Sequence, residues 1–118
     1  MDTTRAIHVY VAGPLTSDPM GGARNAILAG IALEALGFIA YVPHASLLWE
    51  MVQPRDYETW IRHCFAWLSR CDCLLRLPGE SSGSDREVEE AKRLRLPVFW
   101  HVDALVACVA RPVEPLHP

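Results

Sequence analysis

The chain has 118 residues, a formal net charge of −3 and a sequence pI near 5.9. This length fits a single domain with its own core, and the scattered basic residues exclude a charged face for DNA or RNA polymers. Hydrophobic residues make up 51% of the chain without any run long enough to span a bilayer, so we expect a homodimer or higher homo-oligomer and no membrane partner.

The first half of the chain alternates strand and helix signals. Residues 7–12 are β-branched and aromatic and end at Gly13-Pro14, which predicts a strand with a sharp exit. Residues 25–36 are rich in Ala, Leu and Ile and precede Gly37, which suits a left-handed helix C-cap, so we predict a helix. Residues 38–42 form a short apolar run before a proline, which is typical of a buried parallel strand. An irregular loop follows.

The second half continues the alternation. Residues 56–70 carry apolar side chains too densely for one narrow face, which predicts a helix covered on two sides, the second side by another subunit. We then predict a strand at 71–77, a helix at 85–95 and a strand at 97–102. Residues 111–118 contain three prolines and are expected to form an extended or mobile tail, which limits the domain to residues 1–110.

This alternation predicts the α/β class: a single-domain, three-layer flavodoxin- or Rossmann-like fold with a parallel sheet of four or five strands. The loops after the first three strands would then meet at the carboxyl edge of the sheet, where such folds bind ligands. Those loops contain Gly13-Pro14-Leu15-Thr16, Pro43-His44 and residues 79–87. Their convergence favours one site over three unrelated turns.

The third of these loops is built from small residues and runs into a helix that carries Glu87. Free N–H groups at a helix N-terminus bind anions, and the helix dipole favours an ionised carboxylate nearby. Glu87 is therefore a candidate nucleophile beside an anion-binding cradle. The alternative is a capping role, because Ser84 and Glu87 have the S-x-x-E spacing of a capping box, and Ser82 and Asp85 have S-x-x-D.

Further candidates lie near the ends of the first two predicted strands. Tyr10 would orient Glu87 by hydrogen bonding, or be a half-buried strand residue. Gly13 would let a ligand approach the backbone, although Gly-Pro is also an ordinary turn. His44 would bind substrate or transfer a proton, or lie on the surface. Because the G-x-G-x-x-G pattern is absent, we expect no dinucleotide cofactor.

Aromatic, acidic and cysteine residues give weaker signals. Trp49, Tyr57 and Trp60 have faces that would stack on a nucleobase, although Trp60 also suits a core or subunit contact. Asp72 opens the third predicted strand and is a weak candidate for ligand contact. The Cys71-Asp72-Cys73 segment matches no zinc-ligand spacing, so we predict no metal site. The cysteines suit reduced thiols, and the N-terminus shows no signal-peptide core, so we expect a cytoplasmic protein.

Four motifs carry a resemblance to a known family: Val9-Tyr10-Val11-Ala12-Gly13-Pro14, Gly37 followed by Pro43-His44, Cys71-Asp72, and residues 82–91. With them the chain resembles the nucleoside 2-deoxyribosyltransferase-like family, which includes 2′-deoxynucleoside 5′-phosphate N-hydrolases. In that family a glycine precedes the catalytic glutamate and an alanine follows it, as Gly83, Glu87 and Ala91 do here. The resemblance implies Glu87 as nucleophile, Tyr10 as the family's strand tyrosine, and Gly13 to Thr16 as its first loop.

One position departs from the transferases of that family. They often carry an aspartate that contacts the base six residues before the glutamate, and here Ser81 takes its place. The loop Ser81-Ser82-Gly83-Ser84 is more similar to the 5′-phosphate N-hydrolases, whose serines and backbone amides hold the phosphate. The resemblance thus implies a small-molecule partner, a nucleoside or its 5′-monophosphate, whose N-glycosidic bond is cleaved with water as acceptor.

Three alternatives remain open. The enzyme would transfer the sugar to a second base if the closed site excludes water. A module that binds nucleotides without catalysis is a second alternative, permitted by the missing aspartate. A flavodoxin-like carrier is a third, although the loop after the first strand lacks the Ser/Thr-rich phosphate cradle of such carriers.

Overall fold

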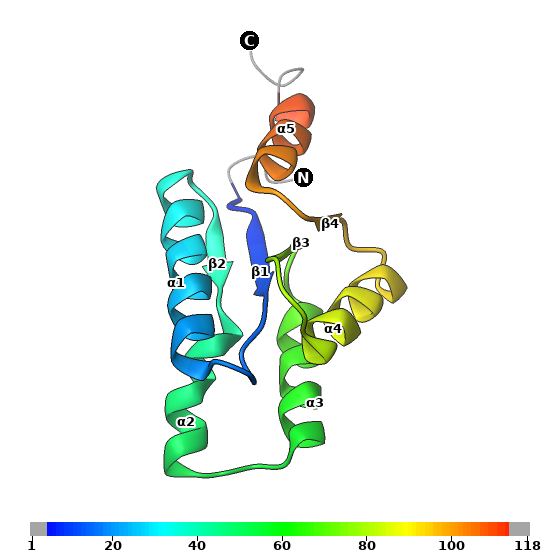
Figure 1. Cartoon of the computed structure of the whole chain (residues 1–118). Helices are drawn as coiled ribbons and strands as arrows, with labels where there is room; N and C mark the ends of the chain where they lie inside the picture. Colours follow the sequence, from blue (N-terminus) through cyan, green and yellow to red (C-terminus); the bar gives the residue numbers. More distant parts are fainter. Residues whose placement is uncertain (1–4, 114–118) are drawn as a thin grey trace.

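The protein is a four-stranded parallel sheet between layers of helices (Figure 1). The structure, a computed structural model, describes residues 5–113. Its strands are β1 (His8–Ala12), β2 (Ile39–Tyr41), β3 (Cys73–Arg76) and β4 (Val98–Phe99), in the order β2-β1-β3-β4. The predicted α/β, Rossmann-like fold with a parallel sheet is confirmed.

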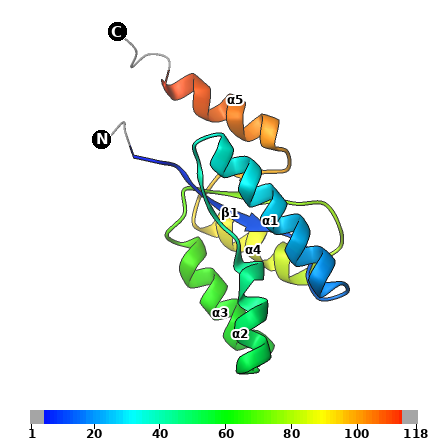
Figure 2. The same ribbon diagram turned by 90° about the vertical axis from the view of Figure 1, so that its left-hand side faces the viewer.

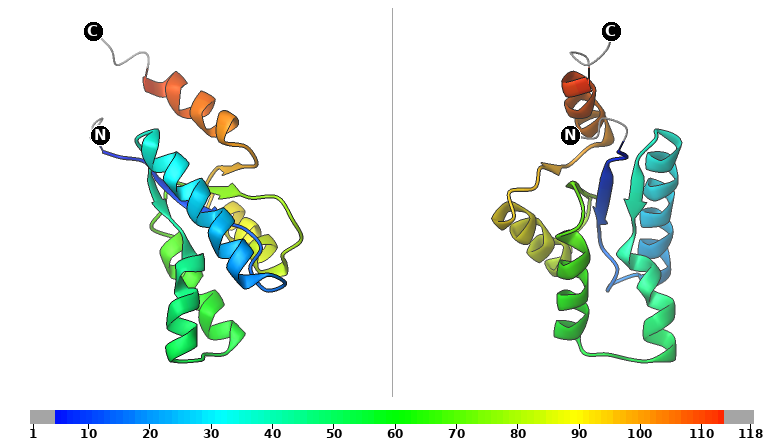
Figure 3. Two further views of the ribbon diagram at one scale, coloured as in Figure 1. Left: turned by 60° about the vertical axis from the view of Figure 1, so that its left-hand side comes forward. Right: turned by 180° about the vertical axis from the view of Figure 1, so that it is seen from behind.

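The helices cover both faces of this sheet and extend beyond its carboxyl edge. They are α1 (Pro19–Ala35), α2 (Leu47–Val52), α3 (Tyr57–Leu68), α4 (Ser82–Arg93) and α5 (Val102–Val113), with a short 3-10 helix, η1 (Pro43–Ser46). Figure 2 shows α1 in front of β1 and α4 behind it. In Figures 1 and 3, α2 and α3 extend past the carboxyl ends of the strands, and α5 lies at the opposite end.

Alternation along β1 divides the core between these layers. Val9 and Val11 belong to one cluster, with Leu33 of α1, whereas Tyr10 belongs to the other, with Val88 of α4. Successive side chains of a strand point to opposite faces, and a central parallel strand buries both. Tyr10 is therefore directed toward α4 by its position in the strand, and its side chain is fully buried.

The strand order creates a switch point between β1 and β3. The chain passes from β1 through α1 to β2 on one side, and later returns to place β3 on the other side of β1. Connections that leave adjacent strands in opposite directions open a crevice at the carboxyl edge of the sheet. The loop after β1 and the loop after β3, which leads into α4, flank this crevice.

The predicted helix at 25–36 begins earlier than expected, at Pro19. Asp18 is its N-cap, because Oδ1 accepts a hydrogen bond from the Gly21 N–H at 3.1 Å, and proline occupies the first helical position. Gly21 and Gly22 concealed this start in the sequence pattern. The predicted end is confirmed, since Gly37 follows with φ +94.

Two other segments differ from the sequence prediction. Residues 47–52, expected to be an irregular loop, form α2, and the strand predicted at 97–102 is reduced to β4 because α5 begins at Val102. The proposed tail boundary is wrong for residues 111–113, which continue α5; residues 114–118 lie outside the described part of the chain.

Within residues 5–113, no helix has the length and apolar character that a membrane crossing requires. The same residues contain no cluster of three or more histidine, cysteine or acidic side chains arranged to hold a metal ion. The cysteines of this part of the chain are all free thiols.

Gly22 lets the first turn of α1 pack directly on the loop after β1. A Cβ atom at this position would lie 2.3 Å from the Pro14 carbonyl oxygen. A glycine-to-alanine change inside a helix ordinarily stabilises a protein by about 0.5–1 kcal/mol. For Gly22→Ala we expect the opposite, a loss of about 1–3 kcal/mol in the free energy of unfolding, measured by urea denaturation. The exposed Ala32→Gly change calibrates helix propensity, and a stabilised Gly22→Ala protein would contradict the tight packing.

Candidate functional site

A cavity of about 670 Å³ opens at the carboxyl edge of the sheet. It is lined from the loop after β1, from η1 and α2, and from the first turns of α3 and α4. Most of the predicted site residues lie on its walls: Gly13, Leu15, His44, Ser81, Ser82, Gly83, Ser84 and Glu87. The three loops expected to converge therefore do so around one cavity.

Glu87 lies on the second turn of α4 and is only 7% exposed. The Tyr10 hydroxyl donates a hydrogen bond to its Oε2 atom. The N-cap of α4 is Ser81, whose Oγ accepts from the Ser84 N–H at 3.1 Å. The capping-box interpretation of Glu87 is therefore wrong, because the cap is complete without it and its carboxylate turns to Tyr10.

The environment of Glu87 favours a neutral carboxyl group. Burial raises its pKa from 4.5 to about 7, and hydrogen bonds from Tyr10 and Cys64 and the charge of Arg76 oppose this shift. The effect of a helix dipole falls off beyond the first turn, whereas desolvation acts on the whole group. The expectation that the helix keeps Glu87 fully ionised is thus corrected: near pH 7, protonated and ionised forms coexist.

Tyr10 and Cys64 both act as proton-bearing neighbours of this carboxylate. Burial and the nearby Glu87 raise the pKa of Tyr10 well above 10, and burial raises the pKa of Cys64 to about 11. Both groups are protonated at neutral pH and can donate hydrogen bonds. Tyr10 comes from β1 and Cys64 from α3, so the carboxylate is held from two elements.

Arg76 fixes the loop that leads from β3 to α4. Its side chain is buried, its guanidinium donates to the Leu77 carbonyl oxygen and to the Gly79 carbonyl oxygen at 2.9 Å, and it forms an ion pair with Asp85 at 3.0 Å. Gly79 has φ +112, and a Cβ there would lie 2.8 Å from Pro14 Cγ. The loops after β1 and β3 are therefore packed against each other. Arg76 was not predicted as a site residue from the sequence. The pattern that could have indicated it is a charged residue at the end of an apolar strand.

His44 is buried beside the loop after β1. Its Nε2 atom lies 2.8 Å from the Gly13 carbonyl oxygen, which requires that nitrogen to donate, and Nδ1 has no partner among the described residues. Burial lowers its pKa, so the ring is neutral at pH 7. This arrangement suits a hydrogen-bond acceptor at Nδ1 and disfavours the predicted proton donor, because the single N–H is already used.

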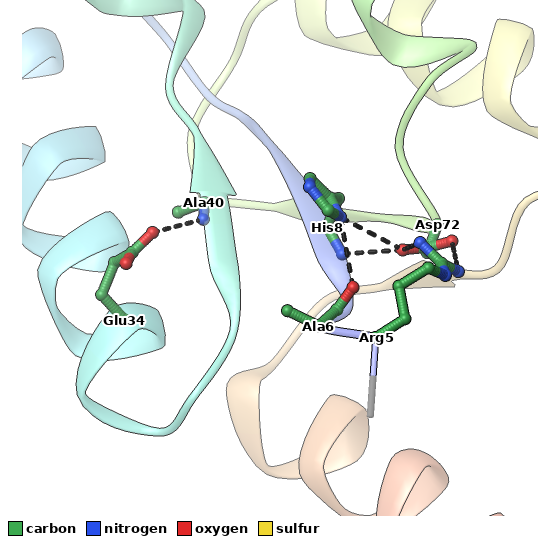
Figure 4. A network of polar contacts seen from close by, with 6 residues as sticks. All are labelled: Arg5, Ala6, His8, Glu34, Ala40 and Asp72. Carbon is green, nitrogen blue, oxygen red and sulfur yellow. Dashed lines mark hydrogen bonds and ion pairs between the residues drawn. The ribbon is translucent and has the colours of Figure 1, made fainter. Parts of the chain in front are cut away.

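Besides Tyr10, three predicted residues lie away from the cavity wall. Pro14 packs on Gly79, and Trp49 packs edge-on against Trp60, with ring centroids 5.6 Å apart. Asp72 lies at the amino end of β3, where it accepts hydrogen bonds from Arg5 and from the His8 N–H at 2.7 Å (Figure 4). Asp72 is thus at the opposite edge of the sheet from Glu87 and does not belong to the site.

Arg55 was not predicted as a site residue from the sequence. It lies on the cavity wall formed by α2 and α3. Its Cζ atom lies 4.0 Å from the ring centroid of Trp60 and 4.6 Å from that of Trp49. The indole rings that were expected to stack on a nucleobase thus carry a guanidinium group. Glu50 lines the same wall and accepts a hydrogen bond from Trp60 Nε1 at 2.5 Å.

A protein family described as "Domain of unknown function (DUF4406)" matches residues 7–100 of the chain. The chain belongs to this family. The DUF4406 match includes all four strands, Tyr10 and Glu87, and it ends before α5. None of the curated proteins matches the chain.

The raised pKa of Glu87 predicts that this residue lowers the free energy of unfolding by an amount that depends on pH. Because the folded protein holds the proton more tightly than the unfolded chain, stability falls as the pH rises from about 4.5 to about 7. Glu87→Gln should remove this cost and raise the free energy of unfolding by about 3 kcal/mol at pH 8, with no gain at pH 4. Urea denaturation at both pH values measures the difference. The exposed Glu89→Gln change on the same helix is the control, and a Glu87→Gln gain independent of pH would contradict burial as the cause.

The charge of Arg76 should lower the pKa of Glu87 measurably. Arg76→Met is expected to raise the upper limit of the pH range over which the Glu87→Gln stability gain develops, whereas Arg76→Lys, which keeps the charge, should raise it less. The methionine variant should also lose about 1–3 kcal/mol, because the Leu77 and Gly79 carbonyl groups lose their donor. The free energy of unfolding of both variants, each with and without Glu87→Gln, measured as a function of pH, tests this electrostatic contribution. An unchanged range in the methionine variant would rule out the electrostatic contribution.

Proposed function

We propose that the protein cleaves the N-glycosidic bond of a nucleoside or nucleoside 5′-monophosphate, with Glu87 as the nucleophile and water as the acceptor. The observation that carries this proposal is the buried carboxylate of Glu87, which accepts a hydrogen bond from Tyr10 and lies at the wall of a cavity large enough for a nucleotide. A carboxylate in a site with a strongly shifted pKa is a candidate for chemistry rather than for structure. The family resemblance of Gly83, Glu87 and Ala91 supports the same assignment.

The reaction follows from the ability of a carboxylate to stabilise an oxocarbenium-like transition state. An oxygen of Glu87 forms a bond to C1′ of the sugar while the bond between C1′ and the base nitrogen breaks. The base leaves with the electron pair and takes up a proton. Water then attacks C1′ and loses a proton to solvent, which balances the proton taken up by the base; the ester bond between C1′ and Glu87 breaks, and the carboxylate is restored as the free sugar leaves.

Tyr10 is the positioning partner in this scheme. It donates to one oxygen of the carboxylate and stays protonated because its own pKa is raised far above neutral. His44 already donates its N–H to Gly13, so water is the better source of the proton that the departing base requires.

The other end of the substrate would lie at the start of α4. The N–H groups at the start of a helix and the hydroxyl groups of Ser82 and Ser84 are donors that suit phosphate oxygens, whereas the Ser81 hydroxyl already donates to Ser84 Oγ at 2.9 Å. A nucleoside 5′-monophosphate would therefore place its phosphate there and its sugar beside Glu87. Transfer of the sugar to a second base remains the alternative reaction, because the same glycosyl-enzyme serves both acceptors.

We also propose a homodimer or higher oligomer, working in the cytoplasm. Large apolar side chains are exposed on α2, where Leu48 and Met51 are each 71% exposed and Val52 is 87% exposed. Exposed apolar groups gathered on one helix are typical of a surface covered by another protein. The free thiols of the described residues suit a reducing compartment.

The activity test is release of base from a panel of nucleosides and 5′-monophosphates, with and without a second base. Glu87→Gln should lower kcat/KM by at least about a hundredfold, since the amide cannot form the glycosyl ester. Below the pKa of Glu87, near 7, kcat/KM should rise about tenfold per pH unit and then level off.

Glu89→Gln, on the exposed face of α4, is the matched control and should keep full activity. Base release by Glu87→Gln at the unaltered rate would reject the nucleophile. Nucleotide binding without release of base from any compound would instead identify a binding module without catalysis.

A further inference from the structure

A second group of polar atoms lies on the cavity wall formed by α2, the start of α3 and the segment between them. Glu50, Arg55 and Trp60 line the cavity there, and none takes part in the mechanism above. Trp49 packs behind them against Trp60. We call these four residues, Trp49, Glu50, Arg55 and Trp60, the arginine wall.

Arg55 stacks on two indole rings and has unsatisfied donors. Its guanidinium lies against both indole rings of the wall, as described above. Its Nε and Nη2 atoms are shielded from solvent and have no hydrogen-bond partner within the described part of the chain. These atoms carry the two parallel N–H bonds on one edge of the guanidinium, and this edge can donate hydrogen bonds to two adjacent acceptors. An unpaired buried donor is energetically costly. The unpaired edge of Arg55 therefore indicates a ligand that offers two adjacent acceptors.

Glu50 places an acceptor on the same cavity wall as Arg55. Its Oε1 atom accepts from the Arg55 backbone N–H at 3.0 Å and from Trp60 Nε1 at 2.5 Å. These hydrogen bonds lower the pKa of Glu50, so the carboxylate is ionised at neutral pH. An ionised carboxylate repels a phosphate group but accepts hydrogen bonds from N–H groups. The arginine wall therefore suits a flat, uncharged ligand group that offers both acceptors and donors.

We propose that the arginine wall recognises the base and selects a 6-oxopurine, guanine or hypoxanthine. O6 and N7 are the adjacent acceptors that match the edge of an arginine, and N1–H is a donor for Glu50. Adenine keeps the N7 acceptor but has an amino group in place of O6 and an acceptor at N1, so it loses one of the two acceptors for Arg55 and the donor for Glu50. The guanidinium turns its edge toward the base on entry. The inference rests on the proposed function for the presence of a nucleotide and for the position of its phosphate at the start of α4.

Binding measured on the Glu87→Gln protein tests this without turnover. Calorimetry would compare the 2′-deoxynucleoside 5′-monophosphates of guanine, hypoxanthine, adenine and cytosine with inorganic phosphate. We expect the two 6-oxopurine nucleotides to bind at least tenfold more tightly than the others. Arg55→Lys keeps the charge but loses the paired edge, so it should weaken guanine nucleotide binding tenfold or more and leave adenine nucleotide binding within about twofold. Arg62→Lys, an exposed change on α3, should alter neither.

Several results would overturn the inference. Equal affinity for all four nucleotides, or tightest binding of the cytosine nucleotide, would reject 6-oxopurine selection. Equal weakening of every nucleotide and of inorganic phosphate by Arg55→Lys would show that Arg55 binds phosphate instead. If Arg55→Lys does not fold by circular dichroism, Glu50→Gln replaces it and must lower the ratio of guanine to adenine nucleotide affinity.

The test separates this inference from the proposed function. Release of base without any preference among bases would leave the glycosidase proposal standing and reject base recognition by the arginine wall. Guanine-selective binding without release of any base would support the wall and reject the glycosidase.

Discussion

The hydrogen bond from Tyr10 to Glu87 is the interaction on which the site depends. It joins the central strand to α4 through two side chains that are almost completely buried. A carboxyl group in such a place is costly to ionise, and its pKa of about 7 expresses that cost. The bond places one oxygen of the carboxylate and leaves the group facing a cavity, which a purely structural glutamate would not need.

The surrounding structure keeps this pair in position. Ser81 completes the N-terminus of α4, and Arg76 ties the preceding loop to the end of β3. Gly79 then brings that loop against Pro14 in the loop after β1. These contacts occur at the switch point of the sheet, where loops from adjacent strands diverge and a ligand has room to enter. The fold thus supplies a rigid frame for the buried carboxylate and for the anion-binding start of α4.

Local patterns predicted much of the fold and part of the site. The β-branched run before Gly13 and the glycine at 37 marked true element ends, and the spacing of Gly83 and Glu87 marked residues that line one cavity. The start of α1 was missed because Gly21 and Gly22 outweighed the Asp-Pro signal before them. The predicted direction of the Glu87 pKa shift was wrong because burial, which raises the pKa, arises from the packing of separate elements around α4, and no local pattern shows that packing. Arg55 was missed for the same reason: its surroundings are two rings that meet it only in three dimensions.

Capture of the glycosyl-enzyme tests the central claim, that Glu87 is the reacting carboxylate, most directly. A 2-deoxy-2-fluoro nucleoside 5′-monophosphate destabilises the oxocarbenium-like transition states of both steps and lets the covalent species accumulate when its base leaves readily. Mass spectrometry of the digested protein should find one added sugar phosphate on the peptide that contains Glu87, and no adduct in Glu87→Gln. Release of base with no adduct, or an adduct on another peptide, would contradict the account.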